Sequence, residues 1–329
     1  MFYAIMLLLV GFAILIKGAD FLVNGASSAA KKYGISNLAI GLTVVAFGTS
    51  MPELIVSLLA ALDGKSDASF GNVIGSNNFN LLLILGIAGL IYPLVVQRNT
   101  VKYEVPLSLL AAVVLFTLVN DVMIFSGSPA EISGNILSRV DSIIFLLFFV
   151  GFLFYIYRTM RTTTDLEEGA PIKLYSTPIS VGMVILGLGM LIGGGELVVD
   201  NAIKIANYFH MSEKLIGLTI LAAGTSLPEL ATSCVAAYRR NTDIAIGNVV
   251  GSNIFNIFFI LGITGMITPI PYNTALNFDI FVLVGSTIVL MIFMFTLNTR
   301  KLDRWEAFLM LMMYFLYVAY LISNDPGAA

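Results

Sequence analysis

The sequence predicts an all-α polytopic membrane protein with ten transmembrane helices, arranged as two inverted five-helix repeats. Three observations lead to this fold class. Hydrophobic residues make up 58% of the 329 residues, charged residues only 11%, and the mean hydropathy is +0.94. Apolar stretches of membrane-spanning length recur along the chain, and two motifs each occur twice, 176 residues apart. A water-soluble protein of this size would need many more surface charges.

Ten apolar stretches approach the roughly 20 residues that an α-helix needs to cross a bilayer. In order, they cover residues 3–24, 38–61, 70–93, 104–121, 140–157, 177–200, 214–237, 246–268, 278–297 and 304–322. Five is an odd number, so the second copy enters the membrane from the opposite side and the repeats are inverted. We expect a first repeat over residues 1–157, a linker over 158–174 and a second repeat over 175–329.

The first predicted helix belongs to this repeat. Residues 1–24 are hydrophobic like a signal peptide but lack its basic n-region, and Gly11 and Asp20 correspond to Gly187 and Glu196 at the repeat spacing. We therefore expect this helix to remain in the mature protein.

Basic residues are distributed unequally between the two sides that ten helices define. Twelve fall in loops on one side: Lys31, Lys32, Arg98, Lys102, Arg158, Arg161, Lys173, Arg239, Arg240, Arg300, Lys301 and Arg304. Four fall on the other: Lys65, Arg139, Lys204 and Lys214. The positive-inside rule then predicts a multi-pass protein of the cell (plasma or inner) membrane with a cytoplasmic linker and both termini outside.

The first repeated motif is GTSMPEL at residues 48–54, which returns as GTSLPEL at 224–230. Each copy places a glutamate in an apolar stretch, where a carboxylate is costly and indicates function. Pro52 has no N–H and its ring clashes with the carbonyl four residues back, so the Gly48 carbonyl loses its helical partner. Two hydroxyls and a carboxylate share one helix face in each copy. These residues are Thr49, Ser50 and Glu53, and Thr225, Ser226 and Glu229.

The second repeated motif is GNVIGSNNFN at residues 71–80, which returns as GNVVGSNIFN at 247–256. Ser76 and Asn80 stand four residues apart on one helix face, as do Ser252 and Asn256. Between residues 40 and 80, 23 of 41 positions are identical to their partners in the second copy. Both motifs therefore keep one register without a gap.

All of these side chains are hard oxygen donors. Calcium takes about six to eight oxygen ligands in a flexible shell, and sodium accepts a similar environment with less charge. Soft transition metals favour Cys and His, and the chain has one of each, Cys234 and His210, neither within a motif. The residues predict a site for transported Ca²⁺ or Na⁺, with no cofactor and no intramolecular disulfide.

Each feature also has a purely structural explanation. The glycines of the second motif suit close helix packing, and a membrane proline can be a plain kink. Ser57 and Ser233 are interpreted as structural, because serine often bonds back to its own helix. The glutamates could be buried in protonated form, but two unused buried carboxyls are costly. The in-register duplication of both motifs favours function.

The paired segments GTSxPEL and GNxxGSNxFN resemble the two alpha-repeats of the calcium/cation antiporter superfamily, in particular its sodium/calcium exchanger branch. The resemblance covers essentially the whole chain. It implies that Glu53 and Glu229 are the central calcium ligands and are shared with a sodium position, and that Thr49 and Thr225 add backbone oxygens to the calcium site. Asn80 matches the family's amide position in the first repeat. The implied outer sodium positions involve Ser50, Ser76, Ser226 and Ser252, with the carbonyls of Ala46 and Ala222.

The chain departs from this pattern at Asn256, where many sodium/calcium exchangers have an aspartate. Only two carboxylates remain, and they neutralise one Ca²⁺, two Na⁺ or two H⁺. A third sodium would leave positive charge in a low-dielectric site. An aspartate that stays protonated is electrically equivalent to Asn256, so both sodium and proton coupling stay open at this point.

The expected function is secondary active antiport of Ca²⁺ for Na⁺ by alternating access, and the chain is not expected to be an enzyme. The helices within 38–93 and 214–268 would hold the site, while predicted helices 1 and 6 resemble a long tilted pair that slides across it. The alternatives are an H⁺-coupled cation exchanger and, less favoured, a cation channel. Expected partners are Ca²⁺, Na⁺ and the lipid bilayer, without nucleic acid or an obligatory protein partner.

Overall fold

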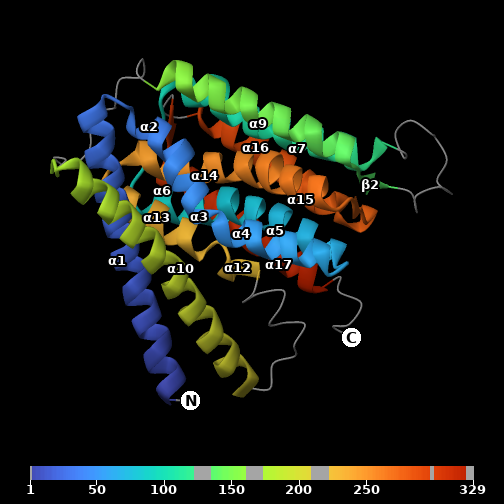
Figure 1. The fold of residues 1–329 in the computed structure, drawn as a ribbon, viewed down its shortest axis with the longest axis horizontal. Coiled ribbons are helices and arrows are strands. Elements are labelled where there is room, and N and C mark those ends of the chain that lie inside the picture. Colours follow the sequence, from blue (N-terminus) through green and yellow to red (C-terminus); the bar gives the residue numbers. More distant parts are fainter. Residues whose placement is uncertain (1, 122–134, 161–172, 209–221, 297–299, 324–329) are drawn as a thin grey trace.

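The computed structural model describes residues 2–121, 135–160, 173–208, 222–296 and 300–323 as a bundle of helices (Figure 1). The α-helices are α1 (Phe2–Tyr33), α2 (Asn37–Ile40), α3 (Ala46–Thr49), α4 (Met51–Leu62), α5 (Ser66–Asn78), α6 (Leu85–Ile91), α7 (Val105–Val119), α9 (Arg139–Thr159), α10 (Thr177–Tyr208), α12 (Ala222–Gly224), α13 (Leu227–Tyr238), α14 (Thr242–Ile254), α15 (Gly262–Ile267), α16 (Asn277–Phe293) and α17 (Arg304–Ser323).

Shorter elements join these helices. The π-helical segments are η1 (Gly41–Val45), η2 (Phe79–Ile84), η3 (Thr100–Glu104) and η6 (Phe255–Leu261), and η7 (Thr274–Leu276) is a 3₁₀ turn. The strands are β1 (Leu94–Val95), β2 (Ile136–Leu137), β3 (Ile270–Pro271) and β4 (Lys301–Leu302). The antiparallel pairs β1–β4 and β2–β3 each join one strand from either half of the chain.

Within the described ranges, eight single helices are long and apolar enough to cross a membrane. A ninth candidate is the bent pair Asn37–Thr49 and Met51–Leu62. These nine correspond to nine of the ten predicted spans. The remaining span, 214–237, begins within residues 209–221, which lie outside the described residues, and its described part holds α12 and α13. The structure is therefore an all-helical polytopic membrane protein.

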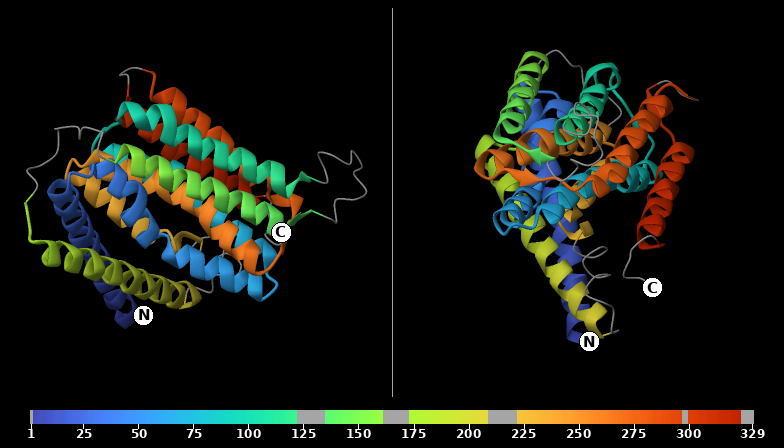
Figure 2. Two further views of the ribbon diagram at one scale, coloured as in Figure 1. Left: turned by 45° about the horizontal axis from the view of Figure 1, so that its top comes forward. Right: turned by 90° about the vertical axis from the view of Figure 1, so that its right-hand side faces the viewer.

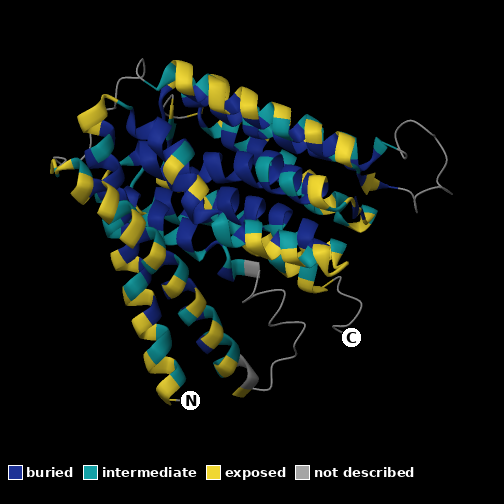
Figure 3. Cartoon of the chain, in the orientation of Figure 1, coloured by how far each residue is buried: buried dark blue, intermediate teal, exposed yellow. Residues whose placement is uncertain are grey.

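The helices that carry the second motif lie at the centre of the bundle. In the most apolar part of Thr242–Ile267, 94% of the residues are buried, and the value for Ser66–Ile91 is 72%, whereas the other single spans reach at most 39%. Figure 3 shows the same division, with buried residues inside and exposed ones on the outer helices. The outer faces remain apolar, as lipid contact requires.

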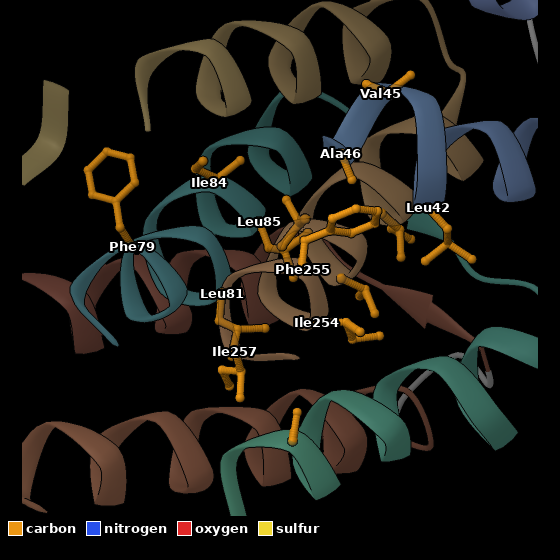
Figure 4. Packing of buried hydrophobic residues seen from close by; sticks show 14 of the residues in the cluster. Leu42, Val45, Ala46, Phe79, Leu81, Ile84, Leu85, Ile254, Phe255 and Ile257 are labelled. Carbon is orange, nitrogen blue, oxygen red and sulfur yellow. The ribbon is translucent and has the colours of Figure 1, made fainter. Parts of the chain in front are cut away.

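Apolar side chains from both repeats pack around this centre. Leu42 and Ala46 from the first repeat and Ile254 and Phe255 from the second lie in one buried cluster with Leu81 (Figure 4). Ala46 is itself a predicted site residue, and Leu81 and Phe255 are next to Asn80 and Asn256 in the chain. The packed core therefore holds the backbone of the site in place.

Helices α1 and α10 cross in antiparallel orientation through their glycines. A Cβ on Gly18 would lie 2.9 Å from the Gly187 carbonyl oxygen, and one on Gly194 would lie 3.2 Å from that of Gly11. Gly187 and Gly194 stand 176 residues after Gly11 and Gly18, so the two contacts are equivalent. Each helix has 32 residues and is about 48 Å long, which exceeds the roughly 30 Å hydrocarbon core and favours a tilt. Figure 2 shows the pair diverging from the other helices.

The glycines of the second motif pack as expected in one copy. A Cβ on Gly247 would lie 3.0 Å from the Leu38 carbonyl oxygen, and one on Gly251 would lie 2.9 Å from that of Leu42. Gly71 and Gly75 have no described atom that close. Their equivalent partner segment is residues 214–222, nearly all of which lies outside the described part of the chain.

Loops that the sequence assigns to one side of the membrane meet at one end of the bundle. The Ser36 N–H donates to the Met160 carbonyl at 2.9 Å, and the Val96 N–H donates to the Arg300 carbonyl at 2.8 Å. Arg239 forms a salt bridge with Asp20. At the other end, the Tyr272 N–H donates to the Asn135 carbonyl at 2.9 Å. The bundle thus has one end rich in basic residues.

Candidate cation site

Two broken helices position the motif glutamates. Helix α3 ends at Thr49 and α4 begins at Met51, with Ser50 between them at φ −83° and ψ 7° and a bend of 46°. In the second repeat, α13 begins directly after Ser226, which has φ −89° and ψ 6°. A proline in the first turn of each new helix prevents a continuous run of helical hydrogen bonds. Each glutamate therefore lies in the first turn of a new helix, near its positive dipole end.

The two repeats exchange hydrogen bonds at the breaks. Ser50 Oγ donates to Glu229 Oε1 at 2.9 Å, and Ser226 Oγ donates to Glu53 Oε1 at 2.9 Å. The two contacts join residues that are equivalent at the 176-residue repeat spacing. All four side chains are buried. The cross-exchange brings both carboxylates into one cluster.

The second motif adds the other two predicted serines. Ser226 Oγ lies 3.0 Å from Ser76 Oγ, and Ser252 Oγ lies 3.3 Å from Glu229 Oε1. Both added serines are buried. The structure therefore groups all four predicted serines with the two glutamates.

A belt of four amides orients Asn80 and Asn256. Asn80 Nδ2 donates to Asn253 Oδ1 at 3.0 Å, and Asn256 Nδ2 donates to Asn77 Oδ1 at 2.9 Å. Asn77 and Asn253 each donate to the other's backbone carbonyl at 3.3 Å. Because the NH₂ groups of Asn80 and Asn256 are held this way, their oxygens point away from the belt.

Four oxygens at the site have no hydrogen-bond partner among the described residues. They are Glu53 Oε2, Glu229 Oε2, Asn80 Oδ1 and Asn256 Oδ1. Each is buried, and a buried polar atom without a partner is costly. None of the salt bridges in the described ranges includes either glutamate. Two carboxylate and two amide oxygens without cationic partners are oxygen donors of the kind that a hard metal ion prefers.

The threonine hydroxyls of the first motif have hydrogen-bond partners beside the cluster. Thr49 Oγ1 lies 3.1 Å from both Val45 O and Asn248 Oδ1, and Thr225 Oγ1 lies 3.2 Å from Asn72 Oδ1. The expectation for both threonines, and for Ala46 and Ala222, concerned backbone oxygens. The Ala46 carbonyl accepts the Ser50 N–H at 3.0 Å, and the side chain of Ala222 lies outside the described residues.

Two further amides, Asn72 and Asn248, brace the motif helices. Asn72 Nδ2 donates to the Glu53 carbonyl at 3.2 Å and to Ser57 Oγ at 2.8 Å. In the second repeat, Asn248 Nδ2 donates to the Glu229 carbonyl at 3.3 Å and to Ser233 Oγ at 2.9 Å. Ser57 and Ser233 also donate to the carbonyls of Ser69 and Ala245 on the next helix, and not to their own helix as the sequence interpretation assumed.

The sequence prediction missed Asn72, Asn77, Asn248 and Asn253. All four lie within the second motif and are identical in its two copies at the repeat spacing, which is the signal that could have identified them. The π-helical segments η2 and η6 begin within the belt, at Phe79 and Phe255, and contain Asn80 and Asn256. Such π-helical turns within α-helices often mark functional sites.

We predict that Asn253→Ala lowers the apparent affinity for Ca²⁺, the ion expected from the sequence, about tenfold, because the Asn80 amide loses its acceptor and its oxygen is no longer held in place. Ca²⁺-dependent transport by the purified, reconstituted protein measures this affinity. Asn277→Ala is the matched control, since Asn277 exchanges similar amide hydrogen bonds with Asn120 at 2.9 and 3.0 Å outside the site. An equal loss of affinity in both variants would show that the belt acts only through stability.

Comparison with known proteins identifies a family and several relatives. Residues 3–158 and 179–323 each match the family described as "Sodium/calcium exchanger protein". The putative antiporter CaxA of Alkalimonas amylolytica is 36% identical over 98% of this chain and 100% of its own length. The inner membrane protein YrbG of Escherichia coli is 40% identical over 82% of this chain and 81% of its own. A structure of the sodium-calcium exchanger NCX_Mj soaked with Na⁺ and Sr²⁺ aligns with a TM-score of 0.80 at 31% identity, covering 96% of this chain and 97% of that one.

Proposed function

The chain belongs to the sodium/calcium exchanger protein family, and from this premise we propose that it is a secondary active antiporter that exchanges Ca²⁺ for Na⁺ across the membrane. The observation that supports this most is the pair of buried glutamates with unpartnered oxygens at the junction of two broken helices. Such junctions near the bilayer midplane are typical ion sites of transporters built from inverted repeats.

Exchange follows from the charge of the site. With no ion bound, two carboxylates without cationic partners carry a charge that is costly to move through an apolar barrier. One Ca²⁺ or two Na⁺ neutralise this charge, so only a loaded site crosses. Because both ions use Glu53 and Glu229, they compete, and one species is carried at a time. Competition for one site couples the two fluxes.

With Asn256 where many sodium/calcium exchangers have an aspartate, the alternative is exchange of Ca²⁺ for H⁺. Two protons neutralise the two glutamates as completely as two sodium ions do. Neither amide can take part in this neutralisation, because the pKa of an amide lies far from the neutral range. Sodium coupling is proposed because of the family and because all donors at the site are hard oxygens. Proton coupling is the alternative because the site has only two carboxylates, Glu53 and Glu229.

Calcium flux in vesicles tests the proposal and separates the alternatives. Protein reconstituted into tight vesicles is given an outward Na⁺ gradient at equal pH, or an outward H⁺ gradient without Na⁺, and ⁴⁵Ca²⁺ uptake is followed. Sodium coupling predicts uptake in the first case only. Uptake driven by the H⁺ gradient alone would establish the alternative, and uptake without either gradient would contradict antiport.

We further propose that ten helices form two inverted repeats and that α1 and α10 move together across the core. The antiparallel crossing of these two equivalent helices supports the inversion. So do the reciprocal hydrogen bonds at the site. Gly48 and Gly224 lie just before the helix breaks and face α10. A Cβ on Gly48 would lie 2.4 Å from Leu188, and one on Gly224 would lie 2.5 Å from Val199. A shift of α10 would therefore act directly on the helix breaks that hold the ions.

We place the protein in the cell membrane with its basic end, and the linker 158–174, in the cytoplasm and both termini outside. The excess of basic residues at that end supports this orientation. In a Cys234→Ala background, Lys32→Cys should react with an impermeant thiol reagent only after the cells are opened. Lys65→Cys should react in intact cells. Both lysines are exposed, so the reverse pattern would contradict the orientation.

A further inference from the structure

A basic hollow lies between the start of the α7 helical run and the end of α16. It has a volume of about 480 Å³ and is lined by Arg98, Val101, Lys102, Phe295 and Arg300. Arg98 and Lys102 stand one helical turn apart, just before and within η3. Arg300 lies just before β4 and comes from the other repeat. Three cations from two repeats therefore surround one hollow.

The positive charge of the hollow is not compensated within the described part of the chain. Arg98, Lys102 and Arg300 form no salt bridge there. Lys102 Nζ lies 5.2 Å from the centre of the Tyr103 ring. Two carboxylates are close to these cations in the chain. Glu104 is buried and accepts from the Tyr155 hydroxyl at 2.5 Å through one of its oxygens, and Asp303 lies 3.1 Å from Lys301 Nζ. An anion is therefore the ligand that the hollow favours.

Backbone contacts hold the hollow in shape. Arg300 has a left-handed conformation, with φ 63°, which is uncommon for a residue with a side chain. Its N–H donates to the Met294 carbonyl at 2.7 Å, and its carbonyl accepts the Val96 N–H at 2.8 Å. The β1–β4 pairing continues this contact through Val95 and Lys301. Arg300 is thus fixed beside the segment that leads to Arg98.

The hollow is level with the surface of the membrane. One candidate span begins at Thr100, two residues after Arg98, and another ends at Phe293, two residues before Phe295. Phe295 is 64% exposed and, with Val101, adds apolar surface to the cationic rim. A ligand at this depth meets cations on its polar part and apolar side chains on the rest.

We infer that this hollow binds an anionic phospholipid, with the lipid phosphate held by Arg98, Lys102 and Arg300 and the beginning of an acyl chain against Val101 and Phe295. Basic pockets between membrane helices at the cytoplasmic surface suit such head groups. The helical run that continues into α7 begins at Arg98, and the positive end of its dipole also attracts a phosphate. Because the cations come from both repeats, a bound lipid would join α7 to the end of α16. This site is separate from the cation site and does not depend on the transported ion.

Native mass spectrometry of the purified full chain tests this inference. Titration with phosphatidylglycerol should show one preferred lipid, bound in excess over phosphatidylcholine. The double variant Arg98→Gln/Lys102→Gln should lower that affinity at least about tenfold, since each basic residue near an anionic lipid contributes roughly fivefold. Arg300→Asn gives a second, independent variant, because Asn tolerates the left-handed conformation, and it should weaken binding about fivefold.

The matched control is Lys31→Gln/Lys32→Gln, which removes the same charge from exposed residues at the end of α1 and should leave the preferred lipid bound. Retention of that lipid by the double variant and by Arg300→Asn would overturn the inference. An equal loss of lipid affinity in the control variant would show that general surface charge, and not this hollow, binds the lipid. Displacement of the lipid by soluble glycerol phosphate at similar concentration would assign the hollow to a free phosphate ester instead.

Discussion

Glu53→Gln and Glu229→Gln are each expected to reduce Ca²⁺ exchange at least about a hundredfold, because each removes one of the two negative charges that balance a divalent ion. The folded state should persist. A glutamine oxygen still accepts the hydrogen bond that Ser226 gives to Glu53, or that Ser50 gives to Glu229, and a neutral amide is less costly to bury than a carboxylate. Initial rates of ⁴⁵Ca²⁺ uptake in reconstituted vesicles measure the effect.

Glu104→Gln is the control for these variants. Glu104 is also a buried carboxylate with one unpartnered oxygen, but its other oxygen accepts from Tyr155, away from the motif helices. We expect this variant to retain exchange. Folded Glu53 or Glu229 variants that carry calcium at the wild-type rate would overturn the assignment of the site.

Asn256→Asp is expected to keep calcium transport and to change its coupling. The two glutamates already neutralise Ca²⁺, so a third carboxylate is useful only with an additional cation or must be protonated at a cost. The structure adds a reason for protonation, because Asn256 Nδ2 donates to Asn77 Oδ1 at 2.9 Å. An ionised aspartate would place an acceptor against that oxygen, whereas a protonated one can still donate.

The sodium Hill slope and the pH profile of exchange measure this change. At low pH the protonated variant should behave like the wild type, and as pH rises the aspartate ionises and the Hill slope for Na⁺ should become steeper. Asn80→Asp, the equivalent change in the first repeat, should give a similar result. Unchanged curves in a well-folded Asn256→Asp protein would place position 256 outside the ion site.

Much of the site could be predicted because both motifs recur in one register. A glutamate, a serine and an asparagine that each occur twice at the same spacing indicate equivalent positions in two halves, and the structure brings Glu53, Glu229 and the four serines together. The helix breaks followed from Pro52 and its counterpart Pro228. Roles of these residues in transport remain predictions.

The contacts between repeats could not be read from the sequence. Helix periodicity relates residues three or four positions apart in one helix, and it placed Ser50 beside Glu53. The hydrogen bond from Ser50 goes to Glu229 instead, and that from Ser226 goes to Glu53, because the helix breaks of the two repeats lie against each other. The same reasoning missed Asn77, which lies next to Ser76 and off the predicted face but contacts the opposite repeat.

Hydropathy also underestimated the first helix, predicted over residues 3–24. Helix α1 continues to Tyr33 through Ser27 and Ser28, which are polar but buried. Ser28 Oγ accepts the Tyr175 N–H at 2.9 Å and lies 3.0 Å from Ser180 Oγ of α10. A polar residue with a hydrogen-bond partner on another helix interrupts the apolar sequence, but the helix itself continues.

Anomalous diffraction from crystals soaked in Sr²⁺, used as a stand-in for Ca²⁺, tests the central claim most directly. We predict one strong peak within coordination distance of Glu53 Oε2 and Glu229 Oε2, with Asn80 Oδ1 and Asn256 Oδ1 facing it, and loss of that peak when excess Na⁺ is added. The Glu53→Gln protein should lack the peak under the same conditions. A strong Sr²⁺ peak elsewhere with none between the two glutamates, or a peak that excess Na⁺ leaves unchanged, would contradict a shared site for calcium and sodium.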